Sequence, residues 1–414
     1  MGAFNITPLA GATVVTPHPT AIGTVALSES VVNILLIGTD YRQADTTFRT
    51  DTLIVASIDK RASTVSLLSI PRDLYVYVPM WGMARVNQAF HAAERNQYPG
   101  GGPALLEQTL LYNLGIPIHF YASVNFDGFR QIVDTLGGIQ VPVNCQLTEY
   151  KLKDPTLDEA DAGNYELFTQ PAGLTEMDGA LALWYARARP VGGDFFRGYR
   201  QRQVLRALYH QGLRANVLPH LPQLYADFRQ VVETDLSLWD IMQFAPLAGQ
   251  LGDAQIRSLH IGPNQTTGWT TPAGDAVLLP KGEALAALVN EFFAGTGGAV
   301  ANRLARPLTW VEVANGGAGE ALEPLAVETL GNEGFAVRLS DGPATARSAT
   351  TLIDYSTSAK GSPLGRLQSV LHISDEHVLA QPDPASPVQF RVILGSDYNP
   401  CPRLDWMDTT EAGE

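Results

Sequence analysis

The segment Val32-Asn33-Ile34-Leu35-Leu36-Ile37-Gly38-Thr39-Asp40 decides the fold class of this chain. Its nearly continuous apolar run is typical of a strand buried on both faces of a sheet. Two more strands are predicted at 52–58 and 64–70, joined by a hairpin loop. Beyond them, helices are predicted at 100–113, 126–136, 178–186 and 200–213, and strands at 119–125 and 139–143. This order predicts an α/β protein, an α/β/α sandwich around a mixed sheet.

The rest of the chain divides by composition. Residues 1–29 are predicted to be a linker or arm, and 30–294 one catalytic domain, with 150–172 irregular and 215–294 mostly helical. A glycine-rich linker is expected at 295–306. A small α/β domain is then predicted at 307–406, followed by a tail at 407–414.

Charge excludes some functions and favours others. The 414-residue chain carries a net charge of -14 and has a pI near 5.0, so a general nucleic-acid role is disfavoured. Six arginines nevertheless lie between Arg187 and Arg206, with Asp194 the one acid among them. A basic cluster on an acidic protein suggests a single local anionic ligand.

Two aspartates flank the end of the first strand. Asp40 follows that strand and Asp51 begins the next, so the two carboxylates could meet at the edge of the sheet. Ligands bind at such strand ends in open α/β sheets, and two carboxylates together with phosphate oxygens suit Mg²⁺. A turn aspartate and a strand-start aspartate without any metal are the alternative.

Arginines gather at the ends of the predicted elements. The arginine fork can donate to two oxygens of a pyrophosphate at once. Arg187 and Arg189 lie two apart, so an extended segment would point both the same way. Solvated surface arginines are the alternative for any single member. Four more arginines lie at the edges of predicted elements: Arg42, Arg49, Arg72 and Arg85. After Asp194 the chain continues with Arg197, Arg200 and Gln201.

Together these segments resemble the LytR-CpsA-Psr family, over roughly residues 32–212 and in the family's order. The last domain, from Trp310-Val311-Glu312-Val313, resembles the LytR C-terminal domain more weakly. The motifs that carry the main resemblance are Asn33 to Asp40, Phe48 to Thr52, Leu67 to Asp73, Gly100-Gly101-Gly102-Pro103, Leu136 to Ile139, Tyr185 to Arg189 and Asp194 to Gln201.

The resemblance implies a phosphotransferase outside the cytoplasmic membrane, associated with the membrane or cell wall. Such enzymes move a glycopolymer from a polyprenyl-pyrophosphate carrier onto peptidoglycan. It implies that Asp40 and Asp51 hold Mg²⁺ or Mn²⁺, and that Asp194, Arg72 and Arg197 act in the transfer. The pyrophosphate would be held by Arg42, Arg49, Arg72, Arg85, Arg187, Arg189, Arg200 and Gln201.

The lipid tail is expected in an apolar tunnel between sheet and helices, with Phe120, Phe129, Val133 and Leu136 as candidates. The family usually has a membrane helix before the first strand, and here no apolar run approaches the roughly 18 residues of a membrane span. The expected contact with the membrane is therefore through the lipid substrate or an anchor removed upstream.

Three functions remain open. Besides the transferase, the same residues could serve a pyrophosphatase or phosphodiesterase, or a lipid-pyrophosphate binding protein without turnover. The paired aspartates favour an enzyme, because binding alone needs only the arginines. A serine hydrolase is disfavoured because the chain lacks a GxSxG motif.

The two cysteines do not have the spacing of a zinc site. An extracytoplasmic location would allow Cys145 and Cys401 to form a disulfide. Such a bond would fix the end of the C-terminal domain to the catalytic domain.

Overall fold

A computed structural model describes residues 23, 25, 27–40, 50–154, 156–158, 160–189, 193–252, 255–294, 309–342, 344–356 and 363–401. Its first part is built on a six-stranded mixed sheet of order β11-β6-β1-β2-β3-β12. β2 runs antiparallel to both β1 and β3. β6 runs parallel to β1, and β12 runs parallel to β3. The strands are β1 (Val31–Thr39), β2 (Thr50–Asp59), β3 (Thr64–Ser69), β6 (Phe120–Asn125), β11 (Val232–Thr234) and β12 (Ile256–His260).

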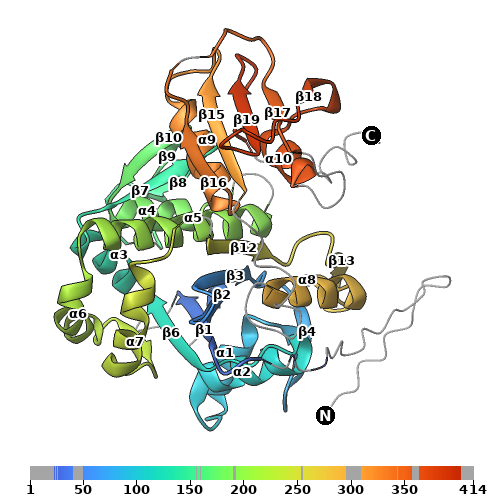
Figure 1. Cartoon of the computed structure of the whole chain (residues 1–414). Helices are drawn as coiled ribbons and strands as arrows, with labels where there is room; N and C mark the ends of the chain where they lie inside the picture. Colours follow the sequence, from blue (N-terminus) through green and yellow to red (C-terminus); the bar gives the residue numbers. More distant parts are fainter. Residues whose placement is uncertain are drawn as a thin grey trace, which may run out of the picture.

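The central strand β1 is covered on both faces because its side chains alternate between them. Leu35 and Ile37 pack in the core beneath α1 (Gln88–Arg95), α2 (Gly101–Leu114) and α8 (Gly282–Ala294). The opposite side of the sheet packs against α5 (Gly193–Arg214) and α7 (Leu238–Ala248). The sheet and the helices on its two sides form an α/β/α sandwich, as the sequence predicts (Figure 1).

Further helices and hairpins surround this sandwich. α3 (Phe126–Thr135) and α4 (Gly179–Arg187) pack beside α5, and α6 (Leu221–Phe228) precedes β11. The paired strands are β4 (Tyr75–Val78) with β5 (Gly82–Arg85), β7 (Ile139–Val143) with β10 (Gly173–Met177), β8 (Leu147–Leu152) with β9 (Tyr165–Gln170), and β13 (Thr266–Thr270) with β14 (Ala276–Pro280).

Two expectations about this part are wrong. Residues 150–172 are not irregular throughout, because most of the β8–β9 hairpin lies there. Residues 215–294 are not mostly helical, since they also contain β11 to β14, and β12 extends the main sheet beside β3. Both errors concern short strands. β12 pairs with a strand that is distant in the sequence, and β8 and β9 carry many polar residues.

A second sheet of order β16-β15-β19-β17-β18 forms the C-terminal part, with α9 (Leu322–Asn332) and α10 (Leu364–Leu371) packed on it. Its strands are β15 (Trp310–Asn315), β16 (Ala336–Leu339), β17 (Thr351–Asp354), β18 (Val378–Ala380) and β19 (Phe390–Leu394). The expected small α/β unit is therefore present. The predicted linker at 295–306 and tail at 407–414 lie outside the described residues.

The two parts of the chain are joined directly. Cys145 and Cys401 form the expected disulfide, with their Cα atoms 4.9 Å apart. Nδ2 of Asn144 donates to Oγ1 of Thr329 on α9 at 2.8 Å. Arg206 of α5 donates to the carbonyl of Gly331 at 3.0 Å. Among the described helices, none is long and apolar enough to cross a bilayer.

Candidate functional site

A bulge in β2 places Asp51 at the end of the β1–β2 ladder. Gly38 pairs with Thr52 and Thr39 pairs with Thr50, so Asp51 is the extra residue between them. A bulge turns a side chain out of the regular alternation, and bulges are frequent beside active sites. Asp40 directly follows Thr39, so the register brings the two predicted aspartates to the same end of the sheet.

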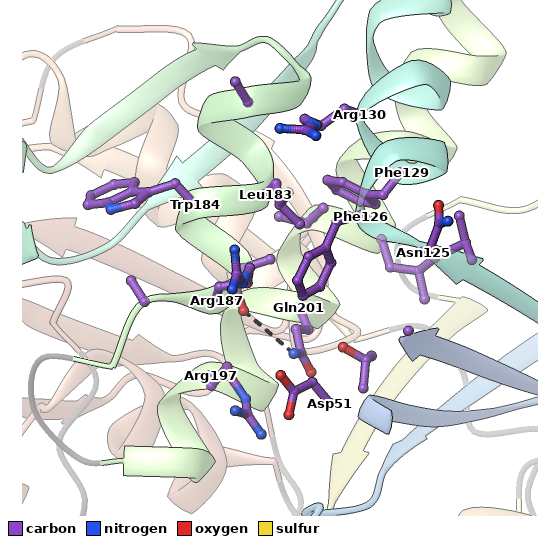
Figure 2. A pocket seen from close by; sticks show the side chains of 18 of the residues that line it. Asp51, Asn125, Phe126, Phe129, Arg130, Leu183, Trp184, Arg187, Arg197 and Gln201 are labelled. Atoms are coloured by element: carbon purple, nitrogen blue, oxygen red, sulfur yellow. Dashed lines mark hydrogen bonds between the residues drawn. The ribbon is translucent and has the colours of Figure 1, made fainter. Parts of the chain in front are cut away.

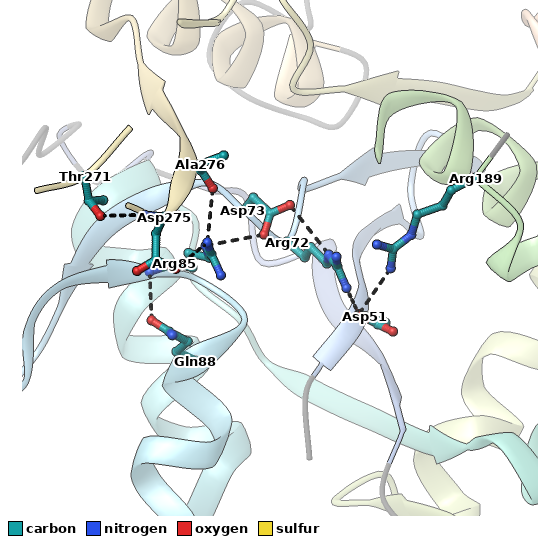
Figure 3. Close-up of polar contacts among 9 residues, drawn as sticks. All are labelled: Asp51, Arg72, Asp73, Arg85, Gln88, Arg189, Thr271, Asp275 and Ala276. Atoms are coloured by element: carbon teal, nitrogen blue, oxygen red, sulfur yellow. Dashed lines mark hydrogen bonds and ion pairs between the residues drawn. The ribbon is translucent and has the colours of Figure 1, made fainter. Parts of the chain in front are cut away.

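Two arginines converge on Asp51 from different elements (Figure 3). Nη1 of Arg72 lies 2.5 Å from Oδ1 of Asp51, and Nη2 of Arg189 lies 3.9 Å from the same oxygen. Arg72 follows β3 and Arg189 follows α4, so only the folded chain brings them together. Burial would raise the pKa of Asp51, but Arg197, Arg72 and Arg189 outweigh it and hold that pKa below its usual value. Asp51 is therefore ionised at neutral pH.

The first turns of α5 supply the next part of the site. Arg197 and Gln201 are four residues apart, so they share one helix face. Arg197 is 2% exposed and its charge acts on Asp51. Nε2 of Gln201 lies 3.5 Å from the carbonyl of Ala186, beside the end of α4. The guanidinium of Arg187 stacks 4.1 Å from the ring centre of Phe126.

One end of a cavity of about 580 Å³ is lined by Asp51, Arg187, Arg189, Arg197 and Gln201 (Figure 2). Arg72 contacts Asp51 but does not line the cavity itself. The rest of the cavity runs between the sheet and helices α3, α4 and α5. Its walls are mostly apolar, formed by side chains such as Leu36, Ile54, Phe129, Leu183 and Leu205. An arginine cluster at one end of an apolar cavity suits a ligand with an anionic head and a hydrocarbon tail.

Carboxylate oxygens, the donors that Asp40 and Asp51 would offer at this end of the sheet, are a ligand type that hard divalent cations take. Mg²⁺ commonly takes one or two carboxylates and fills its shell with water and phosphate oxygens. Asp51, ionised at neutral pH, could provide one carboxylate and Asp40 another. Among the described residues, no group of three or more His, Cys, Asp or Glu side chains is placed to hold a metal. The pair would therefore need phosphate oxygens to complete the site.

Residues 14–289 match the LytR_cpsA_psr family, which covers more than half of the chain. The chain belongs to this family.

Two relatives of this LytR-CpsA-Psr chain carry different functional names. The polyisoprenyl-teichoic acid–peptidoglycan teichoic acid transferase TagU of Oceanobacillus iheyensis is 32% identical over 212 residues, 51% of this chain and 60% of that protein. The regulatory protein MsrR of Staphylococcus aureus is 31% identical over 235 residues, 56% of this chain and 65% of that protein. The matches thus span less than two thirds of the length of either relative.

Two solved structures share the fold of this chain. The crystal structure of B. subtilis TagV has a TM-score of 0.53 and 25% identity, covering 65% of this chain and 98% of that chain. Protein gbs0355 from Streptococcus agalactiae has a TM-score of 0.52 at 18% identity, covering 64% and 88%. The predicted fold class is confirmed.

Two of the arginines expected to bind pyrophosphate in this LytR-CpsA-Psr domain are held elsewhere. Arg85 pairs with Asp73 at 3.6 Å and with Asp275 at 2.9 Å, on the side of Asp73 away from Asp51 (Figure 3). It does not line the cavity. Arg85 therefore lies beside the Arg72–Asp73 pair, and its contact with the pyrophosphate stays a prediction.

Arg200 is also absent from the residues that line the cavity. It is 7% exposed, and its guanidinium donates to the backbone carbonyls of Tyr185, at 2.9 Å, and Ala188. Arg200 therefore holds the segment that carries Arg187 and Arg189, and its contact with the pyrophosphate stays a prediction.

Some predicted residues cannot be placed. Arg42 and Arg49 lie outside the described residues, and so does the side chain of Asp194, although its backbone is in the first turn of α5. Of the tail candidates, Phe129 lines the cavity, whereas Phe120 and Val133 are packed in neighbouring cores. Leu136 lines a second cavity.

The sequence interpretation missed several residues of the cavity. Asn125 ends β6 and caps α3, with its Oδ1 accepting from the Gly128 amide at 2.8 Å. Its place at a strand end next to β1 was a usable signal. The β8–β9 hairpin contributes Tyr150 and Lys151, and Trp184 of α4 holds the hairpin by donating to the Tyr150 carbonyl at 3.0 Å. No local motif marked that hairpin.

Proposed function

We propose that this protein is a phosphotransferase that moves a glycopolymer from a polyprenyl-pyrophosphate carrier onto peptidoglycan. One observation carries the proposal: an ionised aspartate and converging arginines lie at the end of a long apolar cavity. That arrangement suits a pyrophosphate with a polyprenyl tail. The name of the TagU relative describes transfer from a polyisoprenyl carrier to peptidoglycan, which agrees with it.

The reaction requires little covalent chemistry from the protein. An acceptor hydroxyl oxygen attacks the phosphorus that carries the glycopolymer, and the bond from this phosphorus to the bridging oxygen breaks. Polyprenyl phosphate leaves, and the hydroxyl proton passes to a base. Negative charge grows on the equatorial and leaving oxygens, where fixed guanidinium groups such as Arg72, Arg189 and Arg197 stabilise it.

Two roles in this proposal rest on the family resemblance. Asp40 and Asp51 would hold Mg²⁺ or Mn²⁺, which when bound would neutralise charge on the phosphate oxygens. Asp194 would orient or deprotonate the acceptor hydroxyl. Its backbone position, one turn before Arg197 on α5, is compatible with that role.

The proposed setting is extracytoplasmic, at the membrane surface or cell wall. The Cys145–Cys401 disulfide supports this, because disulfides persist mainly in oxidising compartments. The lipid carrier would bring the protein to the membrane. The C-terminal sheet would be a LytR C-terminal-type domain, which is supported by the WVEV sequence of β15 and by the α/β arrangement around it.

The test supplies a polyprenyl-pyrophosphate-linked glycopolymer and peptidoglycan, with Mg²⁺, Mn²⁺ or a chelator. We expect polymer covalently attached to peptidoglycan, in amounts that fall when the metal is chelated. Free phosphate or free glycopolymer without attachment would instead indicate a hydrolase. Donor binding without any product would indicate a binding protein. Undiminished transfer in the chelator would refute the metal while leaving the transferase intact.

A further inference from the structure

Helix α5 has neighbours of two kinds on its different faces. One face lines the cavity and carries Arg197 and Gln201. Another face meets the C-terminal part of the chain, where Arg206 donates to the carbonyl of Gly331 in the last turn of α9 (Figure 1). The arginines at the anionic end of the cavity form what we call the pyrophosphate clamp: Arg72, Arg187, Arg189 and Arg197. α5 therefore lies between this clamp and the C-terminal sheet.

A chain of hydrogen bonds crosses from α9 to α4 through side chains. The Asn144 amide nitrogen donates to the Thr329 hydroxyl of α9 at 2.8 Å, and the Asn144 amide oxygen accepts from Gln203 of α5 at 2.6 Å. Oε1 of Gln203 accepts from the Tyr185 hydroxyl of α4 at 2.8 Å. All four residues are at most 6% exposed. An unsatisfied buried donor or acceptor is costly, so such a chain fixes the relative positions of its members.

The last member of this chain, Tyr185, lies directly before the arginines of the clamp. Arg187 and Arg189 follow it by two and four residues and line the cavity, whereas Tyr185 does not. The Tyr185 carbonyl accepts from Nε of Arg200 at 2.9 Å, and Arg200 also donates to the carbonyl of Ala188. The end of α4 is therefore held by its backbone to α5, and by the Tyr185 side chain to the network that reaches α9.

We propose that the C-terminal part of the chain is a positioning element of the pyrophosphate clamp. It acts from Thr329 through Asn144 and Gln203 on the segment that begins at Tyr185. This inference rests on the proposed function, because that function gives the clamp its ligand. While α9 is docked, the network keeps the two arginines after Tyr185 in the orientation that meets pyrophosphate oxygens. Without α9 the Asn144 amide loses its acceptor, and the end of α4 loses a fixed neighbour.

The coupling must act in both directions. If docking of α9 raises the affinity of the clamp for a pyrophosphate, then binding of a pyrophosphate must stabilise the docked α9 by the same factor. A structural contact without this role would stabilise the fold, but it would not respond to the ligand. The reciprocal effect can be measured on the wild type, so it does not depend on whether a variant folds.

The chain offers a matched pair of buried threonines for the test. The Thr329 hydroxyl donates to the Leu325 carbonyl at 2.7 Å besides accepting from the network. Thr329→Val removes this hydroxyl and keeps the shape, whereas Thr329→Ser keeps the hydroxyl. Thr350 is the control because it is 5% exposed and its hydroxyl also makes two bonds, to Asp397 at 2.8 Å and from the Gly395 amide at 3.1 Å. Both partners of Thr350 belong to the C-terminal part.

The experiment titrates the full chain with geranyl pyrophosphate and records the Tm of each variant. We expect Thr329→Val to bind at least about fivefold more weakly. Thr329→Ser should restore the wild-type affinity. Thr350→Val should lower the Tm about as much as Thr329→Val and leave the affinity unchanged. Tyr185→Phe removes the other end of the network, so its loss of affinity should not add to that of Thr329→Val in the double variant.

Hydrogen exchange provides the second measurement. Geranyl pyrophosphate should slow amide exchange in α9 of the wild type and of Thr350→Val, but not in Thr329→Val. Unchanged affinity of Thr329→Val, or an equal loss in Thr350→Val, would overturn the inference. Additive losses of Thr329→Val and Tyr185→Phe, or exchange in α9 that ignores the ligand, would overturn it too. If the wild type did not bind geranyl pyrophosphate, the proposed function itself would fail, and this inference with it.

Discussion

At the scale of single residues, the site depends on one carboxylate shared among several guanidinium groups. Arg72 and Arg189 approach the same oxygen of Asp51, and Arg197 adds its charge from a buried position. Asp51 keeps these like charges close together before any ligand arrives. A pyrophosphate would find donors already oriented, which is the condition for electrostatic stabilisation without reorganisation.

Arg189→Ala should weaken donor binding. Loss of a charge-assisted contact costs about 1.5–3 kcal/mol, or roughly ten- to 150-fold in affinity. Titration with geranyl pyrophosphate measures it. Arg338→Ala, which removes an arginine paired with Glu312 in the C-terminal sheet, is the control and should leave the affinity unchanged. Equal affinities of Arg189→Ala and wild type would remove Arg189 from the clamp.

Asp51 should make stability depend on pH. Its folded pKa lies below the ordinary value of 3.8, so the ionised form stabilises the fold above that pH. The contribution is lost as the pH falls through the folded pKa. We therefore expect Asp51→Asn to lower the Tm at neutral pH, with a difference from wild type that shrinks below a pH of about 4. Melting curves across that range decide it, and a difference that stays constant at low pH would contradict it.

Asp194→Asn separates catalysis from binding. The change removes the charge that could orient or deprotonate the acceptor, but keeps the size of the side chain. Transfer should fall about 10²- to 10⁴-fold if Asp194 is a general base, while donor affinity persists or rises. Single-turnover transfer and donor titration on the same variant test this. A parallel decline of both would mean that Asp194 only supports neighbouring arginines.

At the scale of elements, the glycine-rich start of α2 is a packing device. Gly100 and Gly101 have φ of 84° and 68°, a region that suits glycine. A Cβ on Gly102 would lie 2.3 Å from the ring of Phe90 on α1, and the Gly102 amide donates to Glu94 at 2.6 Å. The motif therefore allows α1 and α2 to approach closely beneath the sheet.

Gly102→Ala should destabilise the protein, because the ring of Phe90 is buried and has little room to move. Overpacking of this kind costs about 1–3 kcal/mol. Chemical denaturation measures the change. The control is Gly365→Ala on α10, where nothing lies within 4 Å of an added Cβ and the helix should if anything gain stability. Equal destabilisation by the two substitutions would argue against the close packing of α1 and α2.

At the scale of the whole molecule, the C-terminal sheet is fastened to the catalytic part at several points. The disulfide closes a loop between residues 256 apart in the sequence. Asn144 and Arg206 add hydrogen bonds to α9. Asn144 also accepts from Gln203 of α5 at 2.6 Å, so the junction is continuous with the helix that carries Arg197 and Gln201.

Cys401→Ser should lower the free energy of unfolding by up to about 5 kcal/mol on the chain-entropy model for so long a loop. The hydrogen bonds of α9 should keep the domain docked. We expect a lower Tm that no longer responds to a reductant, with donor affinity preserved. Melting of wild type and variant with and without the reductant provides the comparison. A wild-type Tm that does not change on reduction would show that the disulfide does not stabilise the folded chain.

The sequence by itself determined the sandwich class, most of the elements and the arginine-rich character of the site. Apolar runs and helical periodicity are local, so strands such as β1 and helices such as α2 could be predicted. The family motif also marked Asp51, Arg72 and Arg189 as members of one site. The two cysteines allowed a disulfide, but only the structure showed that Cys145 and Cys401 form it.

Only the tertiary structure decided how these residues are used. Arg197 lines the cavity, whereas Arg200, three residues later, donates to backbone carbonyls at the end of α4. Arg85 forms ion pairs with Asp73 and Asp275, and Asp275 lies 190 residues further along the chain. The β8–β9 hairpin, the pairing of β12 with β3 and the second cavity likewise depend on contacts between distant segments. Periodicity records which side of an element is buried, but not which neighbour buries it.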